Sequence, residues 1–154
     1  MKTLYLFVAI IALTVPLVSN ASEWQVTHTA NGLAIAGVQS GEGQIMVACS
    51  PDEGVLIGLI AGTPLKPDLT VGVPVAMAFY SIDGGEENGA LGKLQGPSMI
   101  YLVRPLSGFQ DLYSGLMSGS WISVKYVSAS NRWVEHTFSL KGSTAAIMEV
   151  QNGC

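Results

Sequence analysis

The sequence predicts an all-β fold, an antiparallel β-sandwich with two short helices. Three observations lead to this prediction. The apolar segments are short and rich in Val, Ile, Leu, Tyr and Trp, and most of these residue types favour strands. Gly, Pro, Asn and Asp interrupt the segments at close intervals, as is typical of turns. Two stretches, at about 108–117 and 144–151, instead show the features of short helices.

The first part of the chain has the pattern of successive hairpins. Asn31-Gly32 lies between the first two predicted strands and is a strong hairpin signal. Residues 41–43 and 50–54 provide the next two turns, and residues 83–89 form a polar loop. The predicted strands of this part are 24–29, 33–39, 44–49, 55–61, 73–82, 92–95 and 98–104.

The second part of the chain combines the two helices with one more hairpin. Apolar residues recur with helical spacing at Phe109, Leu112, Tyr113 and Leu116. Strands 121–127 and 132–140 then pair across the turn 128–131, and Ser143 caps the second helix. Alternation along the last strand places His136 on the core face and Trp133 and Glu135 on the opposite face.

The chain begins with the pattern of an export leader. Lys2 precedes an apolar run over residues 4–18, and Ser19-Asn20-Ala21 fits a signal-peptidase site. We therefore expect a signal peptide at 1–21 and a single domain at 22–154. The apolar run is short for a membrane span, so we expect no transmembrane segment after cleavage. The predicted location is the periplasm, with outer-membrane association or secretion as alternatives.

The charge of the chain argues against nucleic acid as a partner. Seven Lys and Arg stand against eleven Asp and Glu, giving a formal net charge of −4. Removal of the leader takes away Lys2 and no acidic residue, so the mature chain is more acidic still. Such a chain lacks the basic surface that binds a phosphate backbone. Only 12% of the residues are charged, which is compatible with a surface that binds a protein or another envelope component.

Cys49 and Cys154 are the two cysteines of the chain. In an exported protein an even number of cysteines is most simply a disulfide framework, and two cysteines allow one pairing. The bridge would close a loop of roughly a hundred residues and contribute at most about 4–5 kcal/mol. The alternative is a thiol nucleophile, but no neighbour in the sequence would activate Cys49.

The stretch from 116 to 147 resembles a known family. It reads Leu-Met-Ser-Gly-Ser-Trp-Ile-Ser-Val-Lys-Tyr-Val, then a polar turn, then His-Thr-Phe-Ser-Leu-Lys-Gly-Ser-Thr-Ala-Ala-Ile. This is similar to the C-terminal half of the invasion-associated locus B family of small exported proteins of Gram-negative bacteria. Residues 138–142 and 144–146 carry most of the similarity, and residues 73–85 resemble the middle of that family. Ser143 departs from it, because the family usually has an aromatic residue there.

The resemblance implies a non-catalytic periplasmic or surface-associated β domain, sometimes linked to host-cell entry and virulence. The family offers no settled set of functional residues that could be transferred to this chain. A similar ending occurs in accessory periplasmic proteins of type VI secretion. A periplasmic inhibitor or a secretion-system accessory protein is therefore the alternative function.

The sequence contains no evident catalytic or metal-binding pattern. His28 and His136 are the two histidines, and no Gly-x-Ser-x-Gly turn is present to position a nucleophile. A small hydrolase built on Ser and His136, or on a carboxylate pair, is the least favoured function. Asp83, Glu86, Glu87 and Asn88 crowd oxygen ligands for calcium into one loop, yet their spacing is not that of an EF-hand. We predict no metal, no cofactor and no enzymatic activity.

Aromatic residues are the remaining candidates for a binding site. Trp133, beside Arg132 and with Lys125 on the neighbouring strand, could contact a partner or a glycan, and Trp121 is a second candidate. The alternative for each tryptophan is that it seals one end of the sandwich. Residues 55–60 are apolar on both faces, which indicates a central strand; as an edge strand they could instead pair with a partner.

Overall fold

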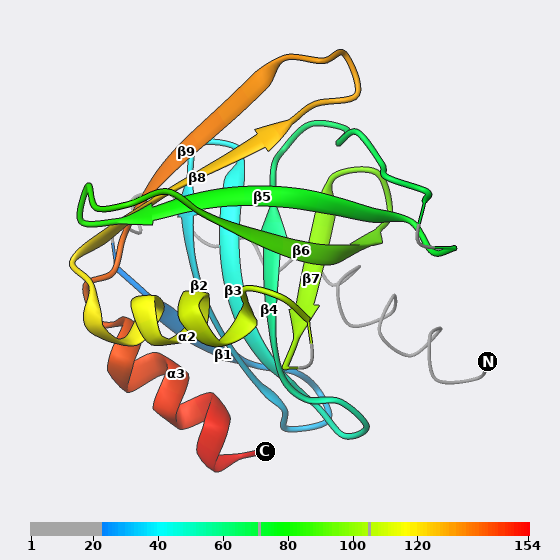
Figure 1. Ribbon diagram of the computed structural model, residues 1–154. Helices are drawn as coiled ribbons and strands as arrows, with labels where there is room; N and C mark the ends of the chain where they lie inside the picture. Colours follow the sequence, from blue (N-terminus) through cyan, green and yellow to red (C-terminus); the bar gives the residue numbers. More distant parts are fainter. Residues whose placement is uncertain (1–22, 71, 105) are drawn as a thin grey trace.

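The computed structural model describes residues 23–70, 72–104 and 106–154 (Figure 1). The predicted leader lies outside these residues, so cleavage after Ala21 stays a prediction. The described part contains nine strands and two helices: β1 Gln25–His28, β2 Ala34–Ser40, β3 Gly43–Ser50, β4 Gly54–Ile60, β5 Val75–Ile82, β6 Asn88–Gln95, β7 Met99–Val103, α2 Phe109–Ser118, β8 Trp121–Val127, β9 Trp133–Ser139 and α3 Ser143–Asn152.

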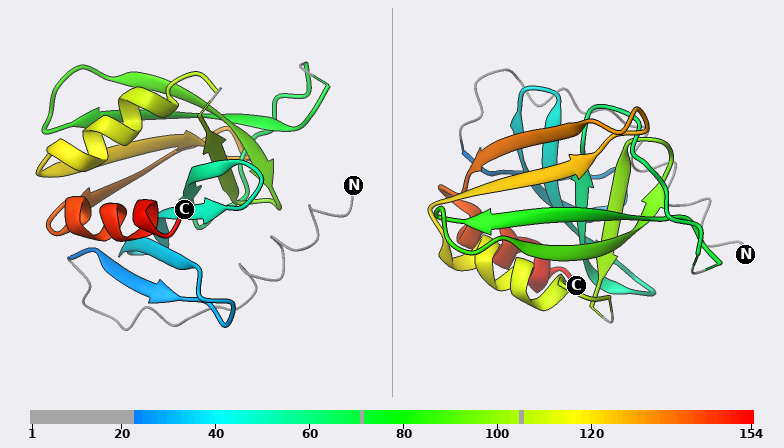
Figure 2. Two further views of the ribbon diagram at one scale, coloured as in Figure 1. Left: turned by 90° about the horizontal axis from the view of Figure 1, so that it is seen from below. Right: turned by 45° about the horizontal axis from the view of Figure 1, so that its top comes forward.

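All nine strands belong to one antiparallel sheet. Their order is β1-β2-β3-β4-β7-β6-β5-β8-β9. The sheet curls, so that the half containing β1 to β4 faces the half containing β5, β6, β8 and β9 (Figure 2). The predicted antiparallel all-β fold with two short helices is confirmed. The stretch at 55–60 is β4, which pairs with β3 and β7 and is therefore a central strand with no free edge.

The main core lies between the two halves of the sheet. Alternate residues of each strand point inward, as Ile57 and Leu59 do on β4. Both helices lie side by side between the two halves (Figure 2) and add apolar side chains to this core: Phe109, Leu112, Leu116, Ala146, Ile147 and Val150. Burial of these helix faces explains why two ten-residue helices are stable here, since isolated helices of that length are marginal in water.

Two hydrogen bonds join the start of α3 to the last turn of α2. The Ser143 hydroxyl, at the start of α3, donates to the Leu116 carbonyl at 2.6 Å. The Thr144 hydroxyl donates to the Met117 carbonyl at 2.7 Å. These carbonyls belong to the last turn of α2, where no further helical N–H is available to them. Ser143 therefore acts on the neighbouring helix rather than as the cap of its own helix, and Gly142 occupies the N-cap position of α3.

Trp24 connects the two edges of the curled sheet at one end. Its backbone N–H donates to the Lys141 carbonyl at 3.1 Å. Its indole Nε1 donates to the Ser139 carbonyl at the end of β9, also at 3.1 Å. The side chain is buried, with 7% of its surface exposed. The start of β1 and the end of β9 are thus held together although they lie far apart in the sequence.

The largest difference from the predicted strands is at β6. The sequence predicts a strand that starts at residue 92, whereas β6 starts at Asn88. Asn88, Gly89 and Gly92 have the composition of a turn, but cross-strand packing replaces the missing side chains. A Cβ atom on Gly89 would lie 3.1 Å from the methyl group of Met77. Met77 therefore covers the Gly89 backbone, and such packing overrides local propensity.

Candidate binding surface on the outer face of the sheet

The two histidines do not assemble a nucleophile–base pair. His136 is half-buried, and its Nε2 lies 2.9 Å from the Ala61 carbonyl oxygen. Its ring packs directly on Gly43, where a Cβ atom would be only 2.5 Å from the ring Cγ. The hydrogen-bond partner of His136 is thus a backbone carbonyl rather than a hydroxyl or a carboxylate. His28 is exposed and lies 3.4 Å from Glu149.

The acidic loop between β5 and β6 uses its polar groups within the fold. The Asp83 carboxylate accepts hydrogen bonds from the backbone N–H groups of Ser120 and Trp121, both at 2.9 Å. Glu87 pairs with Lys125 on β8. Within the part of the chain that the structure describes, no group of three His, Cys, Asp or Glu residues is placed to hold a metal ion.

An outer strip crosses β5, β8 and β9, and we define it as Met77, Phe79, Lys125, Trp133 and Glu135. The strand register places Phe79 opposite Lys125, and Lys125 opposite Glu135. Trp133 follows two residues away on the same face of β9, where it is 64% exposed. Its ring meets Phe79 edge-on, with 5.7 Å between the ring centroids. The contact holds a large aromatic ring in a defined position while most of its surface faces solvent.

Charges alternate along a row that runs from Glu87, in the loop before β6, through Lys125 on β8 to Glu135 on β9. The Lys125 ammonium lies 2.8 Å from the Glu87 carboxylate. This hydrogen bond and the attraction of Glu87 raise the pKa of Lys125, and Glu135 adds a smaller effect in the same direction. The Ser123 hydroxyl donates a hydrogen bond to Glu135. The row Glu87–Lys125–Glu135 therefore ends in a carboxylate at the edge of the sheet.

The structure separates the four residues predicted for binding into two places. Trp133 and Lys125 lie together in the outer strip, and Arg132 is exposed at the adjoining turn, with Nε 3.4 Å from the Ser130 hydroxyl. Trp121 lies at the opposite end of β8, where it pairs with Ser139. Its ring packs against the backbone of Gly84, so it closes the β5–β6 turn, although 40% of its surface is exposed.

Sequence reasoning missed Met77 and Phe79 as part of this surface. Both lie on β5, which the sequence predicts correctly as a strand. Period-two alternation along that strand places them on one face and Ala78 and Tyr80 on the other. The alternation was available in the sequence. The pairing of β5 with β8, which brings Phe79 to Trp133, was not.

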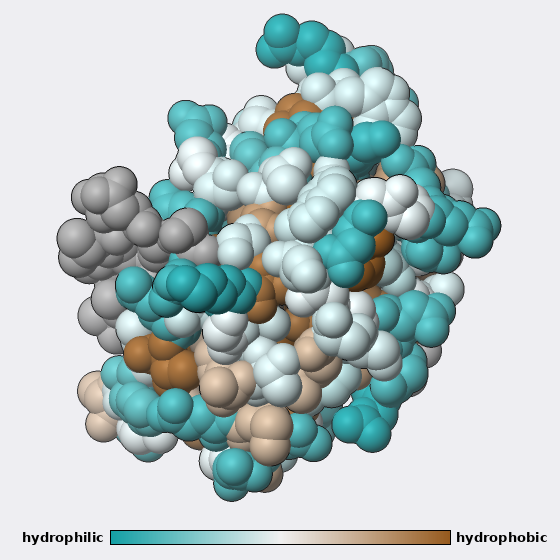
Figure 3. All heavy atoms as spheres, turned by 90° about the vertical axis from the view of Figure 1, so that its left-hand side faces the viewer, coloured by the Kyte–Doolittle hydropathy of each residue, from teal (hydrophilic) through white to brown (hydrophobic). Residues whose placement is uncertain are grey.

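One face of the molecule has no extended hydrophobic patch in Figure 3. On the face shown in Figure 3, hydrophobic atoms form small separate patches among hydrophilic and weakly polar ones. This agrees with a chain in which 12% of the residues are charged. Exposed large apolar side chains of the described residues include Leu69, Val73 and Met148, and single exposed residues of this kind are normal.

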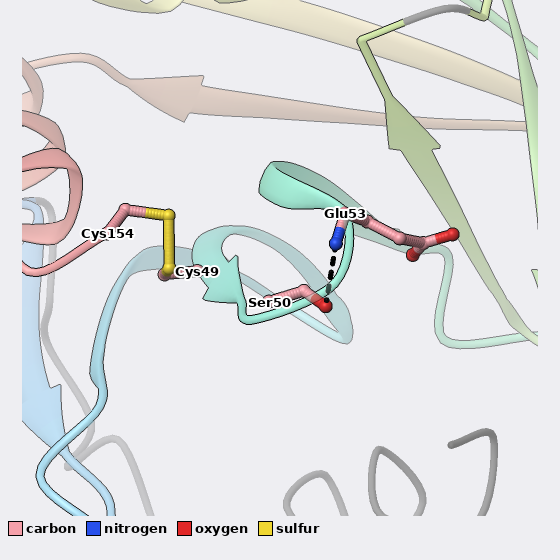
Figure 4. The surroundings of a disulfide bond; sticks show 4 residues. All are labelled: Cys49, Ser50, Glu53 and Cys154. Carbon is pink, nitrogen blue, oxygen red and sulfur yellow. Dashed lines mark hydrogen bonds between the residues drawn. A yellow bond between two sulfur atoms is a disulfide. The ribbon is translucent and has the colours of Figure 1, made fainter. Parts of the chain in front are cut away.

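The predicted disulfide between Cys49 and Cys154 is confirmed (Figure 4). It joins the end of β3 to the segment after α3, with 5.4 Å between the Cα atoms and a sequence separation of 105. Beside it, the Ser50 hydroxyl accepts a hydrogen bond from the Glu53 N–H at 3.4 Å and orders the β3–β4 turn (Figure 4). The bridge fixes α3 against the sheet, and such bridges are typical of oxidising compartments.

Comparison with known proteins shows a similarity of fold. The chain is similar to the crystal structure of invasion associated protein B from Bartonella henselae, with a TM-score of 0.52 over 82% of this chain and 90% of that chain. The sequence identity is 10%, so the likeness concerns the fold alone. No family model matches the chain, and no curated protein matches it. In the described residues, neither helix has the length and apolar character needed to cross a membrane.

Proposed function

We propose that this chain is an exported, non-catalytic binding protein of the bacterial envelope, and that it contacts a protein or another envelope component through the outer strip. The observation that carries the proposal is Trp133, which is 64% exposed and held edge-on by Phe79. A rigid, solvent-exposed tryptophan beside charged residues is typical of binding hot spots. Arg132 and Lys125 lie next to it and supply polar contacts.

Two further observations support the place and the kind of function. The disulfide supports residence in the periplasm or outside the cell, because thiols stay reduced in the cytoplasm. The similarity in fold to an invasion associated protein supports a role in host interaction. His136 and Asp83, which are two of the candidate catalytic or metal-binding residues, are engaged in structural contacts, and this favours binding over catalysis.

Site-specific photo-crosslinking in living cells tests the proposal. A photoreactive phenylalanine analogue replaces Trp133 in one variant and Met148 in a control, since Met148 is also exposed, at 49%, but lies on α3. We expect the same covalent adduct in repeated experiments with the variant at 133 and no such adduct with the variant at 148. Absence of an adduct at 133, or identical adducts at both positions, would contradict the proposal.

A further inference from the structure

The direction of the backbone groups shows that β9 has an open edge. In an antiparallel strand, the N–H and C=O of one residue point to the same side, and those of the next residue to the other side. The Leu140 N–H donates to Ser120, on the side of β8. The Ser139 and Lys141 carbonyls instead accept from Trp24, on the outer side. The odd-numbered residues of β9 therefore direct their backbone groups away from β8.

Trp24 forms hydrogen bonds only at the end of this edge, to the carbonyls of Ser139 and Lys141. Among the described residues, the outward N–H and C=O groups of Trp133, Glu135 and Thr137 have no backbone partner. β9 contacts β2. In Figure 1 it moves away from β2 as it approaches the turn at 128–131, so this part of the edge is the one farther from Trp24. Three alternate residues whose outward backbone groups are unpaired form a template for another strand.

The edge lacks several of the features by which proteins prevent strand addition, and Glu135 is the one acidic side chain on it. Natural edge strands carry Lys or Pro, or are interrupted by a β-bulge. The sequence of β9 is Trp-Val-Glu-His-Thr-Phe-Ser, with neither Lys nor Pro. Its register with β8 is continuous from Trp133 to Ser139, so no bulge interrupts it. The edge is therefore regular over its open length.

The charges of the outer strip define what an added strand would carry. Glu135 ends the row Glu87–Lys125–Glu135 at this edge. A Lys or Arg placed opposite Glu135 would continue the alternation of charge, and opposite charges directly across a strand pair are stabilising. Two positions further along the added strand, a side chain on the same face would lie beside Trp133. An apolar side chain there would cover the exposed ring.

A second copy of this chain fits the edge poorly. The antiparallel pairing that uses all three open residues places Glu135 opposite Glu135 of the other copy, and like charges directly opposite are destabilising. A shift by two residues in one direction reduces the pairing to two residues. The shift in the other direction requires the Ser139 carbonyl, which already accepts the Trp24 indole.

We propose that β9 binds an extended segment of a partner protein as a tenth, antiparallel strand of the sheet. The segment carries Lys or Arg opposite Glu135 and an apolar residue two positions later, beside Trp133. This inference rests on the proposed function and names the chemistry of its partner. The new strand forms its backbone hydrogen bonds to Trp133, Glu135 and Thr137, and its side chains determine which segment is accepted.

The first test uses a synthetic peptide, Ser-Thr-Val-Lys-Val-Leu-Ser with blocked termini, and the ¹⁵N-labelled exported chain. We expect NMR shift changes at the amides of Trp133, Glu135 and Thr137, and hydrogen exchange at these amides slowed at least about tenfold at saturation. The amides of Val134 and His136 point toward β8 and should change less. Equal changes on both sets, or changes confined to another part of the chain, would overturn the proposal.

Matched peptides separate the backbone and charge contributions. A peptide with N-methyl groups on the threonine, lysine and leucine loses the donors that face β9, and we expect no measurable binding. A peptide with glutamate in place of lysine should bind about fivefold more weakly. The variant Glu135→Lys should reverse this preference. Unchanged affinity of the N-methylated peptide, or an unchanged preference in the variant, would refute strand addition.

Variants at Thr137 distinguish this inference from the proposed function itself. Thr137→Pro removes one outward N–H and leaves the β8 pairing intact, so we expect about tenfold weaker peptide binding. Thr137→Ala keeps the N–H and should bind like the parent chain. If the crosslinked adduct at position 133 persists in Thr137→Pro while the peptides do not bind the parent chain, the outer strip binds its partner by side chains and strand addition is wrong. Elution of the parent chain as a dimer, with the three amides already protected, would also overturn it.

Discussion

Removal of the Cys49–Cys154 bridge should lower the free energy of unfolding by several kcal/mol. The bridge spans 105 residues, and the loss of loop entropy in the unfolded chain then corresponds to about 4–5 kcal/mol. Strain in the native state and compactness of the unfolded chain reduce this figure, so we expect about 3–5 kcal/mol. This is a large part of the about 5–15 kcal/mol that stabilises a typical domain.

Urea unfolding of the variant carrying both Cys49→Ala and Cys154→Ala measures this loss. With a denaturant slope of about 1.5 kcal/mol per molar urea, the midpoint should fall by about 2–3 M. The slope itself should rise, because the unfolded chain without the bridge exposes more surface. The parent chain under reducing conditions is the control and should behave like the variant. A loss below about 1 kcal/mol with an unchanged slope would refute the loop-entropy reasoning and show that packing of α3 alone holds this end of the chain.

Three further substitutions test individual contacts by urea unfolding. Trp24→Phe keeps a buried ring but removes the indole N–H that binds β9, and should lower the free energy of unfolding by about 0.5–1.5 kcal/mol. An unchanged unfolding midpoint would contradict the role of Trp24 in joining the start of β1 to the end of β9. Gly43→Ala should displace the His136 ring and cost about 1–3 kcal/mol, whereas Gly153→Ala meets no atom nearer than 3.6 Å and serves as the control with little effect. Tyr126→Phe should stabilise the chain by up to about 1 kcal/mol at neutral pH, because the buried Tyr126 hydroxyl has no hydrogen-bond partner among the residues that the structure describes. Burial also raises the pKa of Tyr126, so the unfolded chain releases this proton more readily, and the parent chain should lose stability above about pH 10 more steeply than the variant; parallel pH profiles would contradict this.

The sequence predicts the local elements of this fold more readily than their arrangement. Period-two alternation alone places His136 on the core face and Trp133 on the outer face, and both positions agree with the observed burial. Apolar spacing and Gly119 delimit α2 to within about a residue. These features depend on residues that are close together in the sequence, so one amino-acid sequence is sufficient to predict them.

The features that sequence reasoning missed depend on pairings between distant segments. β5 pairs with β8 as well as with β6, and no local sequence pattern indicates the pairing with β8. The partners of Trp133 in the outer strip therefore remained hidden. Gly89 favours a turn in the sequence. The side chain that covers it, Met77, comes from another strand, so local composition does not reveal the contact. The sequence places Trp24 in the first strand, whereas β1 starts at Gln25. The bonds of Trp24 to Ser139 and Lys141 require the finished curvature of the sheet.

The bond from the Trp24 indole to the Ser139 carbonyl spans 115 positions of the chain, and this has a consequence for the order of folding. While Cys49 and Cys154 are still reduced, we expect a contact between such distant positions to form late, since the chain must first lose the entropy of the large loop between them. The hairpins of the central strands are local and can form earlier. We therefore expect the junction between β1 and β9 to close late and to fray early, and the amides of the open stretch of β9 to exchange faster than those of the central strands.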